Sequence, residues 1–170
     1  MKIPMFFLFS FFLFFVSCSK SEEAITSTVK NPDIETLPVT VNKALLLELV
    51  NVPRKKGCQC GDVYYPPVPA LTWNAQLELA AYKHSKDMYE NKYFSHIAKD
   101  GSNGGVRIER AGYNRMAYAE NIGEGYINEN QVFTAWLNSP GHCKNIMGKL
   151  YKEMGVARVG TYWTQDFGSR

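Results

Sequence analysis

Three histidines, His84, His96 and His142, are the scarcest residues in the chain that could carry acid–base or metal chemistry. Imidazole titrates near physiological pH and is the commonest metal ligand in proteins. His96 falls in an expected loop and His142 at an expected helix start, positions from which a side chain often reaches a surface cleft. His84 falls on the apolar side of an expected helix, which favours a packed histidine with satisfied hydrogen bonds. His96 and His142 are therefore the better candidates for chemistry.

The chain lacks the motifs of several common enzyme classes. It has no phosphate-binding glycine loop with its lysine, no strained serine elbow and no histidine pair four residues apart around a glutamate. The formal net charge of +3, from 19 basic and 16 acidic residues, comes without the clustered basic patch of nucleic-acid-binding domains. With 45% hydrophobic and 21% charged residues, the composition is that of a globular protein.

The four cysteines are Cys18, near the N-terminus, and Cys58, Cys60 and Cys143 further along. In an oxidising compartment, a disulfide is expected among the last three. Cys58 and Cys60 are poor partners for each other in so short a loop, so one of them is expected to pair with Cys143, and the other stays a free thiol. A catalytic role for Cys143 beside His142 is disfavoured, because adjacent helical residues point about 100° apart.

The first 17 residues predict a secretory signal peptide. Lys2 precedes the apolar run Ile3 to Val16, and the small residue Ser17 follows it. This run is shorter than the roughly 20 residues of a membrane-spanning helix. Seven of the ten phenylalanines lie in this segment, so much of the aromatic content of 14% does not belong to a folded core.

The segment Phe15-Val16-Ser17-Cys18 resembles the bacterial lipobox, with Phe in place of the usual Leu. In a lipobox the cysteine is lipidated and becomes the mature N-terminus, and two acyl chains are enough for stable anchoring. The alternative is an ordinary signal peptide with an incidental cysteine. Residues 19–42 lack an apolar period, so residues 18–42 are expected to form a lipidated N-terminus and a flexible linker. Ser19, which is not Asp, is compatible with outer-membrane delivery.

Residues 43–170 have the patterns of a single α+β domain. A first helix is expected to end at Pro53, and a punctuated loop follows at 57–69. The remaining expected elements are helices at 74–90, 107–111, 131–138 and 140–146, a flexible loop at 101–105, a strand at 117–125 and an antiparallel hairpin around Gly160. Ser139 is expected to cap a helix, and Trp73, Trp136 and Trp163 are expected to lie in the core.

Six segments, in this order along the chain, resemble the CAP superfamily, which comprises the cysteine-rich secretory, antigen 5 and pathogenesis-related class 1 proteins and is also called the SCP domain. The segments are Leu71-Thr72-Trp73-Asn74, Phe94-Ser95-His96, Asp100-Gly101-Ser102, Ala119-Glu120-Asn121-Ile122, Trp136-Leu137-Asn138-Ser139-Pro140-Gly141-His142 and Tyr162-Trp163-Thr164-Gln165-Asp166-Phe167-Gly168. The chain resembles the bacterial secreted branch. The resemblance implies a three-layer α-β-α sandwich around a small antiparallel sheet, and it favours Cys60 over Cys58 as the partner of Cys143.

Eukaryotic CAP proteins carry two histidines and two glutamates around a central cleft, a set that can hold a divalent cation such as zinc. By the resemblance, His96 matches the first histidine and Glu120 the first glutamate. The second glutamate position holds Ser139, and residues 150–153, at the second histidine position, contain no histidine. If His142 converges with His96 and Glu120, the three make a His-His-carboxylate site with an open position. The alternative is a hydrogen-bonded network that braces the cleft.

Together, the lipobox resemblance at Cys18 and the CAP resemblance imply a lipid-anchored, extracytoplasmic domain of the bacterial cell envelope that acts by binding rather than by catalysis. The candidate ligands are a small apolar molecule such as a lipid or sterol, a divalent cation, and an envelope component, held in the central cleft. One alternative is a metal-dependent hydrolase or protease that uses His96, Glu120 and His142, and another is a structural surface protein. No nucleic-acid partner is expected, and the oligomeric state is left open.

Overall fold

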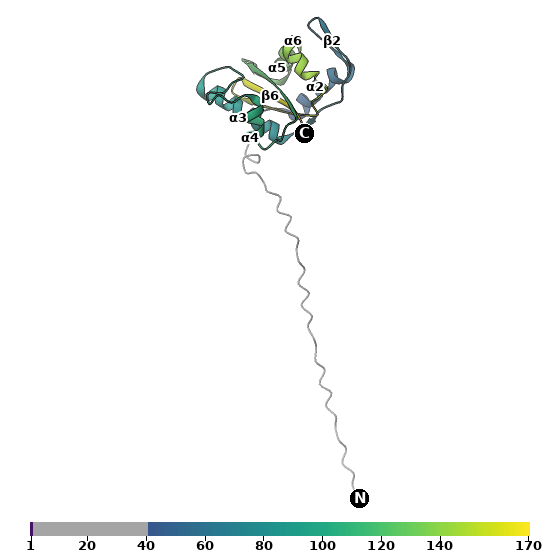
Figure 1. The fold of residues 1–170 in the computed structure, drawn as a ribbon, viewed down its shortest axis with the longest axis vertical. Helices are drawn as coiled ribbons and strands as arrows, with labels where there is room; N and C mark the ends of the chain where they lie inside the picture. Colours follow the sequence, from purple (N-terminus) through teal and green to yellow (C-terminus); the bar gives the residue numbers. More distant parts are fainter. Residues whose placement is uncertain (2–40) are drawn as a thin grey trace.

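The computed structural model describes Met1 and residues 41–170, which form the domain in Figure 1. The expected signal peptide, Cys18 and nearly all of the expected linker lie outside the described residues. Within the described part of the chain, no helix combines the length and the apolar character needed to cross a membrane.

The domain contains helices and strands in a mixed order. In chain order they are α2 (Lys43–Lys56), β1 (Cys58–Cys60), β2 (Val63–Tyr65), β3 (Thr72–Trp73), α3 (Ala75–Asn91), α4 (Gly104–Arg110), β4 (Ala117–Glu124), α5 (Glu129–Asn138), α6 (Pro140–Ile146), β5 (Glu153–Val159) and β6 (Tyr162–Ser169). This mixture confirms the α+β fold class predicted from the sequence.

The main sheet has four strands in the order β3-β5-β6-β4. Strand β6 is central and pairs antiparallel with both β4 and β5. The β5–β6 connection turns at Gly160, whose φ of 59° suits a residue without a side chain, and so the predicted hairpin is confirmed. The sheet is antiparallel except for the two-residue β3, which pairs parallel with β5.

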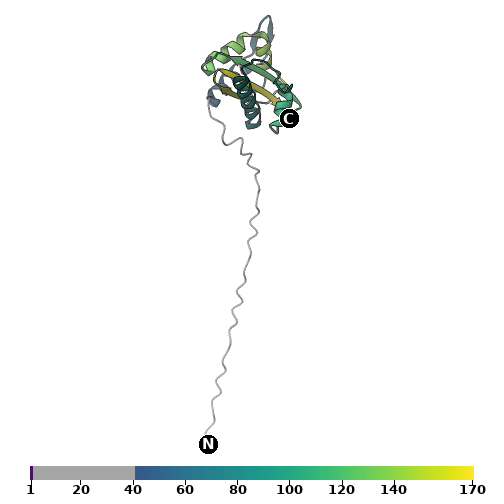
Figure 2. The same ribbon diagram turned by 90° about the vertical axis from the view of Figure 1, so that its left-hand side faces the viewer.

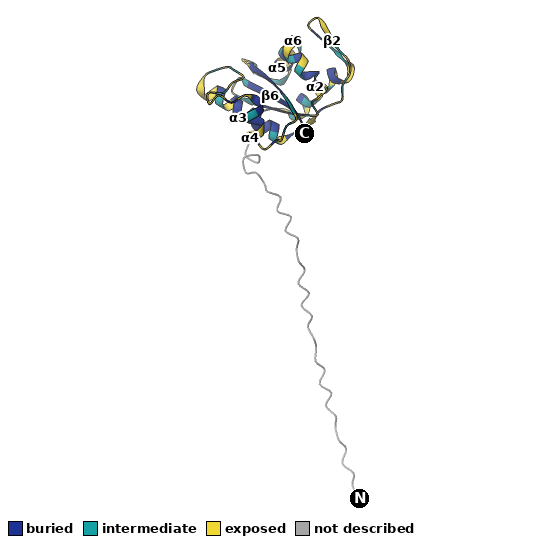
Figure 3. Cartoon of the chain, in the orientation of Figure 1, coloured by how far each residue is buried: buried dark blue, intermediate teal, exposed yellow. Residues whose placement is uncertain are grey.

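Helices cover both faces of this sheet, as Figures 1 and 2 show. Helix α3 lies along β5 and β6, with α4 beside it, and α2, α5 and α6 belong to the opposite layer. Figure 3 shows that the buried residues gather where the helices meet the sheet. At Gly155 of β5 an added Cβ would lie 2.1 Å from the backbone nitrogen of Glu78, so only glycine permits the close approach of α3. The three-layer sandwich implied by the resemblance is therefore present.

Helix α2 does not end at Pro53, as the sequence predicted, but continues to Lys56. Proline removes one helical hydrogen bond, but the turn that follows is held by tertiary contacts. Arg54, in that turn, is completely buried, and its guanidinium donates to the carbonyl oxygens of Pro69 and Ile146 at 2.6–2.9 Å. Packing at Arg54 therefore outweighs the local effect of Pro53.

Two expected loops contain regular structure. Residues 58–65, expected to be irregular, form the hairpin β1–β2. Each strand of this hairpin has only three residues, which is too short for an alternating sequence pattern to predict it. The expected flexible loop at 101–105 gives way at Gly104 to helix α4, because the side chain of Asn103 accepts a hydrogen bond from the Val106 amide. An Asn at this position is a strong N-cap.

Candidate functional site

Glu120, on β4, is the centre of a buried polar cluster. Its side chain is only 4% exposed, and each carboxylate oxygen has a cationic or imidazole partner. Oε1 lies 2.7 Å from Nδ1 of His96, and Oε2 accepts from the guanidinium of Arg107, on α4. The imidazole of His96 is about half exposed, so it reaches from solvent to the buried carboxylate. His96 and Glu120 are thus brought together, in agreement with the resemblance.

Arg107 connects this cluster to the loop that carries His96. Its Nη1 donates to the carbonyl oxygen of Ser102 at 2.8 Å and to that of His96 at 3.1 Å. One guanidinium therefore fixes the backbone of the 95–103 loop and the side chain of Glu120 at the same time. This role of Arg107 was not predicted from the sequence. The available signal was an arginine in a short helix that begins just after the N-cap residue Asn103.

The ionised form of Glu120 is stabilised by these partners. Burial alone would raise the pKa of this carboxyl group, but the hydrogen bond from His96 and the charge of Arg107 bring it below its ordinary value. The carboxylate is therefore charged at neutral pH. Because both oxygens are already engaged, Glu120 is poorly placed to act as a free general base.

Asp166, on β6, lies directly across the strand pair from Glu120. It is completely buried, and neither carboxyl oxygen has a hydrogen-bond donor among the described residues. Burial, and secondarily the charge of Glu120, raise the pKa of Asp166 well above its ordinary value. The raised pKa favours the protonated form of Asp166 beside the ionised Glu120. The sequence did not lead us to predict this pair; the signal that could have indicated it is an acidic residue, Asp166, within a predicted strand of mostly uncharged residues.

His84 is also buried close to this cluster. Its Nε2 lies 2.9 Å from the carbonyl oxygen of Ser95, but its Nδ1 has no partner among the described residues. Burial lowers its pKa, and the negative charge of Glu120 acts in the opposite direction. The predicted packing of His84 is confirmed, whereas its hydrogen bonding is only half satisfied.

His142, on α6, borders a cavity of about 370 Å³ beside the cluster. The cavity is lined by Phe94, Ile122, Gly123, Glu124, Tyr126, Ala135, Trp136, Ser139 and His142. Burial lowers the pKa of His142, with a smaller contribution from His96, so its ring is neutral at neutral pH. This cleft combines apolar and aromatic side chains with the polar groups of Glu124, Ser139 and His142.

The donor set does not fit a zinc ion. Within residues 41–170, the ligand atoms of His96, Glu120 and His142 do not all lie within 4.8 Å of one another. The two that do meet leave fewer protein ligands than structural or catalytic zinc uses. Both oxygens of Glu120 are, moreover, engaged by Arg107 and His96. The arrangement matches the bracing network that the sequence offered as the alternative.

Ser139 and the three tryptophans considered in the sequence can also be placed in the structure. Ser139 is the N-cap residue of α6, as expected, but its side chain makes no capping hydrogen bond and borders the cleft. Trp136 and Trp163 are buried and donate to the carbonyl oxygens of Ile122 and Tyr126. Trp73 is only half-buried, and its indole donates to Glu78.

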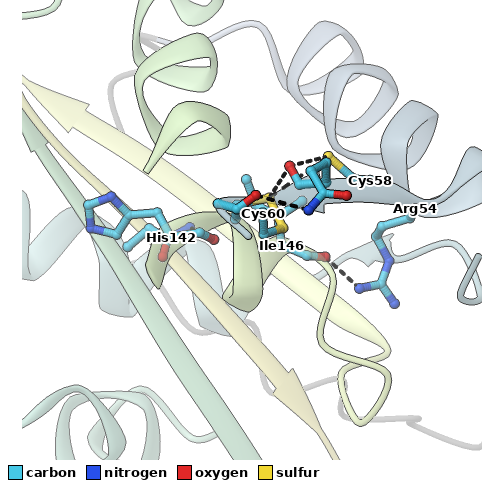
Figure 4. The surroundings of a disulfide bond; sticks show 9 residues. Arg54, Cys58, Cys60, His142 and Ile146 are labelled. Carbon is cyan, nitrogen blue, oxygen red and sulfur yellow. Dashed lines mark hydrogen bonds between the residues drawn. A yellow bond between two sulfur atoms is a disulfide. The ribbon is translucent and has the colours of Figure 1, made fainter. Parts of the chain in front are cut away.

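A disulfide joins Cys60 of β1 to Cys143 of α6, which are 83 positions apart in sequence, with a Cα–Cα distance of 5.4 Å. Among the cysteines of residues 41–170, Cys58 is the free thiol. This is the pairing that the resemblance favoured. Figure 4 shows the sulfurs grouped on one side of α6, whereas His142 projects away from them toward the other side.

Among solved structures, an extracellular protein with an SCP domain from Bacillus anthracis has a TM-score of 0.66 and 29% identity, over 75% of this chain and 40% of that one. An outer surface protein from Borrelia burgdorferi has a TM-score of 0.63 and 24% identity, over 75% of this chain and 91% of that one. At this identity the second likeness shows the fold alone.

The uncharacterized membrane protein YlbC of Bacillus subtilis is 32% identical over 131 residues, which are 77% of this chain but 35% of YlbC. The chain therefore spans about a third of the length of that relative. Residues 47–167, more than two thirds of the chain, match the model of the cysteine-rich secretory protein family. With this match and the sandwich fold described above, the chain belongs to the CAP family.

Proposed function

We propose that this CAP domain is an extracytoplasmic binding module, tethered through Cys18 to a bacterial membrane, that holds a small apolar ligand in the cleft beside His142. The observation that carries the proposal is that both carboxylate oxygens of Glu120 are engaged by His96 and Arg107, next to a cleft lined by aromatic and polar side chains. With both oxygens engaged, Glu120 is better suited to stabilise the wall of the cleft than to take part in catalysis.

The cleft has the size and lining of a ligand site. Its volume of about 370 Å³ falls within the range of small-molecule pockets, which are mostly apolar with a few polar groups that orient the ligand. Phe94, Tyr126 and Trp136 supply aromatic side chains, and Glu124, Ser139 and His142 supply the polar groups. A lipid- or sterol-like molecule with one polar end suits this combination.

The polar cluster supports the cleft from one side. Phe94 lines the cleft two residues before His96, and the carbonyl oxygen of His96 is held by Arg107. On β4, Ile122 lines the same cleft two residues after Glu120. The network thus fixes both walls, and preorganised walls lower the free-energy cost of binding.

The tether is supported by the sequence and by one similar structure. The segment Phe15-Val16-Ser17-Cys18 resembles the lipobox, and the similar Bacillus anthracis protein is extracellular. Metabolic labelling with a palmitate analogue is expected to mark the wild-type chain and not Cys18→Ala. Equal labelling of both would contradict the anchor.

Binding is tested with two fluorescent probes, a dansylated fatty acid and dehydroergosterol, titrated into the purified chain. We expect saturable binding of at least one probe, weakened about tenfold by Phe94→Ser, because burying a phenylalanine contributes about 1.5–3 kcal/mol. Phe94 is 47% exposed, so its replacement should leave the core intact.

Ile97→Ser provides the matched control. Ile97 is 51% exposed, lies in the same loop and does not line the cleft, so its replacement should leave affinity unchanged. Absence of saturable binding by either probe, or equal loss of affinity in both variants, would contradict an apolar ligand in this cleft.

A further inference from the structure

Three sulfur atoms meet where β1 lies against α6. The Sγ atoms of Cys58, Cys60 and Cys143 all lie within 4.8 Å of one another, although one disulfide can use only two of them. The free Sγ of Cys58 is 3.8 Å from Sγ of Cys143 (Figure 4). The bridged cysteine therefore has a second candidate partner close by.

Strand geometry explains why both candidates face Cys143. Cys58 and Cys60 are two residues apart on β1, and side chains at this spacing point to the same face of a strand. The sequence predicted a loop here, in which the two side chains need not share a direction. As a strand, it presents the side chains of both Cys58 and Cys60 to Cys143 of α6.

We propose that these residues form a thiol–disulfide exchange centre, in which Cys58 and Cys60 alternate as the disulfide partner of Cys143. The Cys58 thiolate attacks Sγ of Cys143, and a Cys58–Cys143 bond forms as the Cys60–Cys143 bond breaks. The electron pair leaves on Cys60, which takes up the proton that Cys58 released. The reaction has no net oxidation and needs no external reagent.

The environment of Cys58 allows this reaction and limits its rate. Cys58 is half-buried, in contrast to the buried Cys60 and Cys143, so it is the most accessible of the three. Burial nevertheless raises the pKa of its thiol, which keeps the nucleophilic thiolate scarce near neutral pH. The exchange is therefore slow and depends on the short approach to Cys143.

Exchange would move the attachment of the β1–β2 hairpin to α6. Two residues along a strand correspond to about 6.6 Å. The last residue of this hairpin, Tyr65, and the chain that follows it at Pro66 and Val68 face the end of α6 across a cavity of about 330 Å³. The choice of cysteine thus sets how one wall of this cavity is held, and the two pairings define two forms of the domain.

The test uses the full oxidised chain, with Cys18 read as a separate peptide. After the native chain has been incubated in mildly alkaline buffer without reductant, exchange is quenched with acid and the chain is unfolded in acidic denaturant, so that the buried Cys60 becomes accessible. Free thiols are then alkylated with N-ethylmaleimide, and tandem mass spectrometry locates the label. We expect label on Cys58 in some molecules and on Cys60 in others. Label confined to Cys58 at every incubation time would overturn the proposal.

Cys58→Ser is the matched control. It keeps the Cys60–Cys143 bridge but removes the attacking thiol, so Cys60 should stay unlabelled. Labelling of Cys60 in this variant would show that its thiol arises without Cys58 and would also overturn the proposal.

The second pairing is tested directly in Cys60→Ser. After oxidation in air, this variant is expected to contain a Cys58–Cys143 disulfide, so neither cysteine is alkylated after an acid quench and unfolding in acidic denaturant. If both are alkylated under these conditions while circular dichroism of the untreated variant shows the native fold, Cys58 cannot take the place of Cys60 and the proposal fails.

Discussion

Arg54 and Arg107 are two buried guanidiniums that the fold neutralises in different ways. Arg54 is completely buried, and its N–H donors go to the carbonyl oxygens of Pro69, Ile146, Gly148 and Tyr151. Arg107 is 8% exposed and forms an ion pair with Glu120 in addition to its contacts with carbonyl oxygens. One cation thus binds backbone alone, whereas the other is paired with a titratable carboxylate.

The contacts of Arg54 are therefore expected to be independent of pH, whereas the ion pair of Arg107 is expected to depend on it. Burial lowers the pKa of Arg54 only to about 10, so its charge and its hydrogen bonds persist at neutral and acidic pH. The ion pair of Arg107 depends on the ionisation of Glu120, which is itself coupled to Asp166. The candidate site therefore lies on the region of the domain that responds to protonation, and Arg54 holds a region that does not.

The largest effect is expected for Arg54→Met. This change leaves four carbonyl oxygens without their donor, and a buried unpaired group costs about 1–3 kcal/mol each. We expect a loss of about 4 kcal/mol or more in the free energy of unfolding, measured by urea denaturation. Lys55→Met, at the neighbouring exposed position, is the control and should stay near the wild type. A comparable loss of unfolding free energy in both variants would show that the buried contacts of Arg54 are not what stabilises the domain.

Arg107→Met is expected to cost about 3 kcal/mol near neutral pH, because it leaves Glu120 buried with His96 as its remaining polar partner. The folded-state pKa of Glu120 is lowered, so this stabilisation is present above the unfolded pKa of about 4.3 and is lost as pH falls through the folded value. The deficit of Arg107→Met should therefore shrink in acid, and that of Arg54→Met should not. Equal pH dependence of the two deficits would contradict the comparison.

A smaller effect, of opposite sign, is expected for Asp166→Asn. The pKa of Asp166 is raised in the folded state, so the folded chain binds a proton that the unfolded chain releases above about pH 3.9. Wild-type stability falls through this window as pH rises, and the neutral asparagine removes that loss. We expect the variant to be at least as stable as the wild type at neutral pH, with its relative advantage gone near pH 3. Chemical denaturation across pH measures this, and a deficit that grows with pH would show that Asp166 is not protonated in the fold.

Much of the fold follows from local chemistry that can be recognised in the sequence. Asn74 caps α3, accepting hydrogen bonds from the amides of Gln76 and Leu77, and Gly160 turns the β5–β6 hairpin. These features depend on residues a few positions apart. For that reason the helix at 75–91 and the antiparallel hairpin were predictable.

The rest depends on contacts between distant residues. The partners of Arg54 lie 15 to 97 residues away, so nothing near Pro53 shows that the helix continues. Asp166 meets Glu120 only through the register of β4 and β6. Likewise, the meeting of His96 with Glu120 was suggested by a family resemblance, and no spacing in the chain implies it.

The central claim is that Glu120 braces the cleft through His96 and Arg107, in place of holding a metal ion. Calorimetric titration of Zn²⁺ into the wild-type chain and into His96→Ala tests it most directly, since loss of His96 removes one of the two ligands that meet. The account predicts no saturable binding that depends on His96. One-site binding by the wild type that His96→Ala abolishes would contradict it.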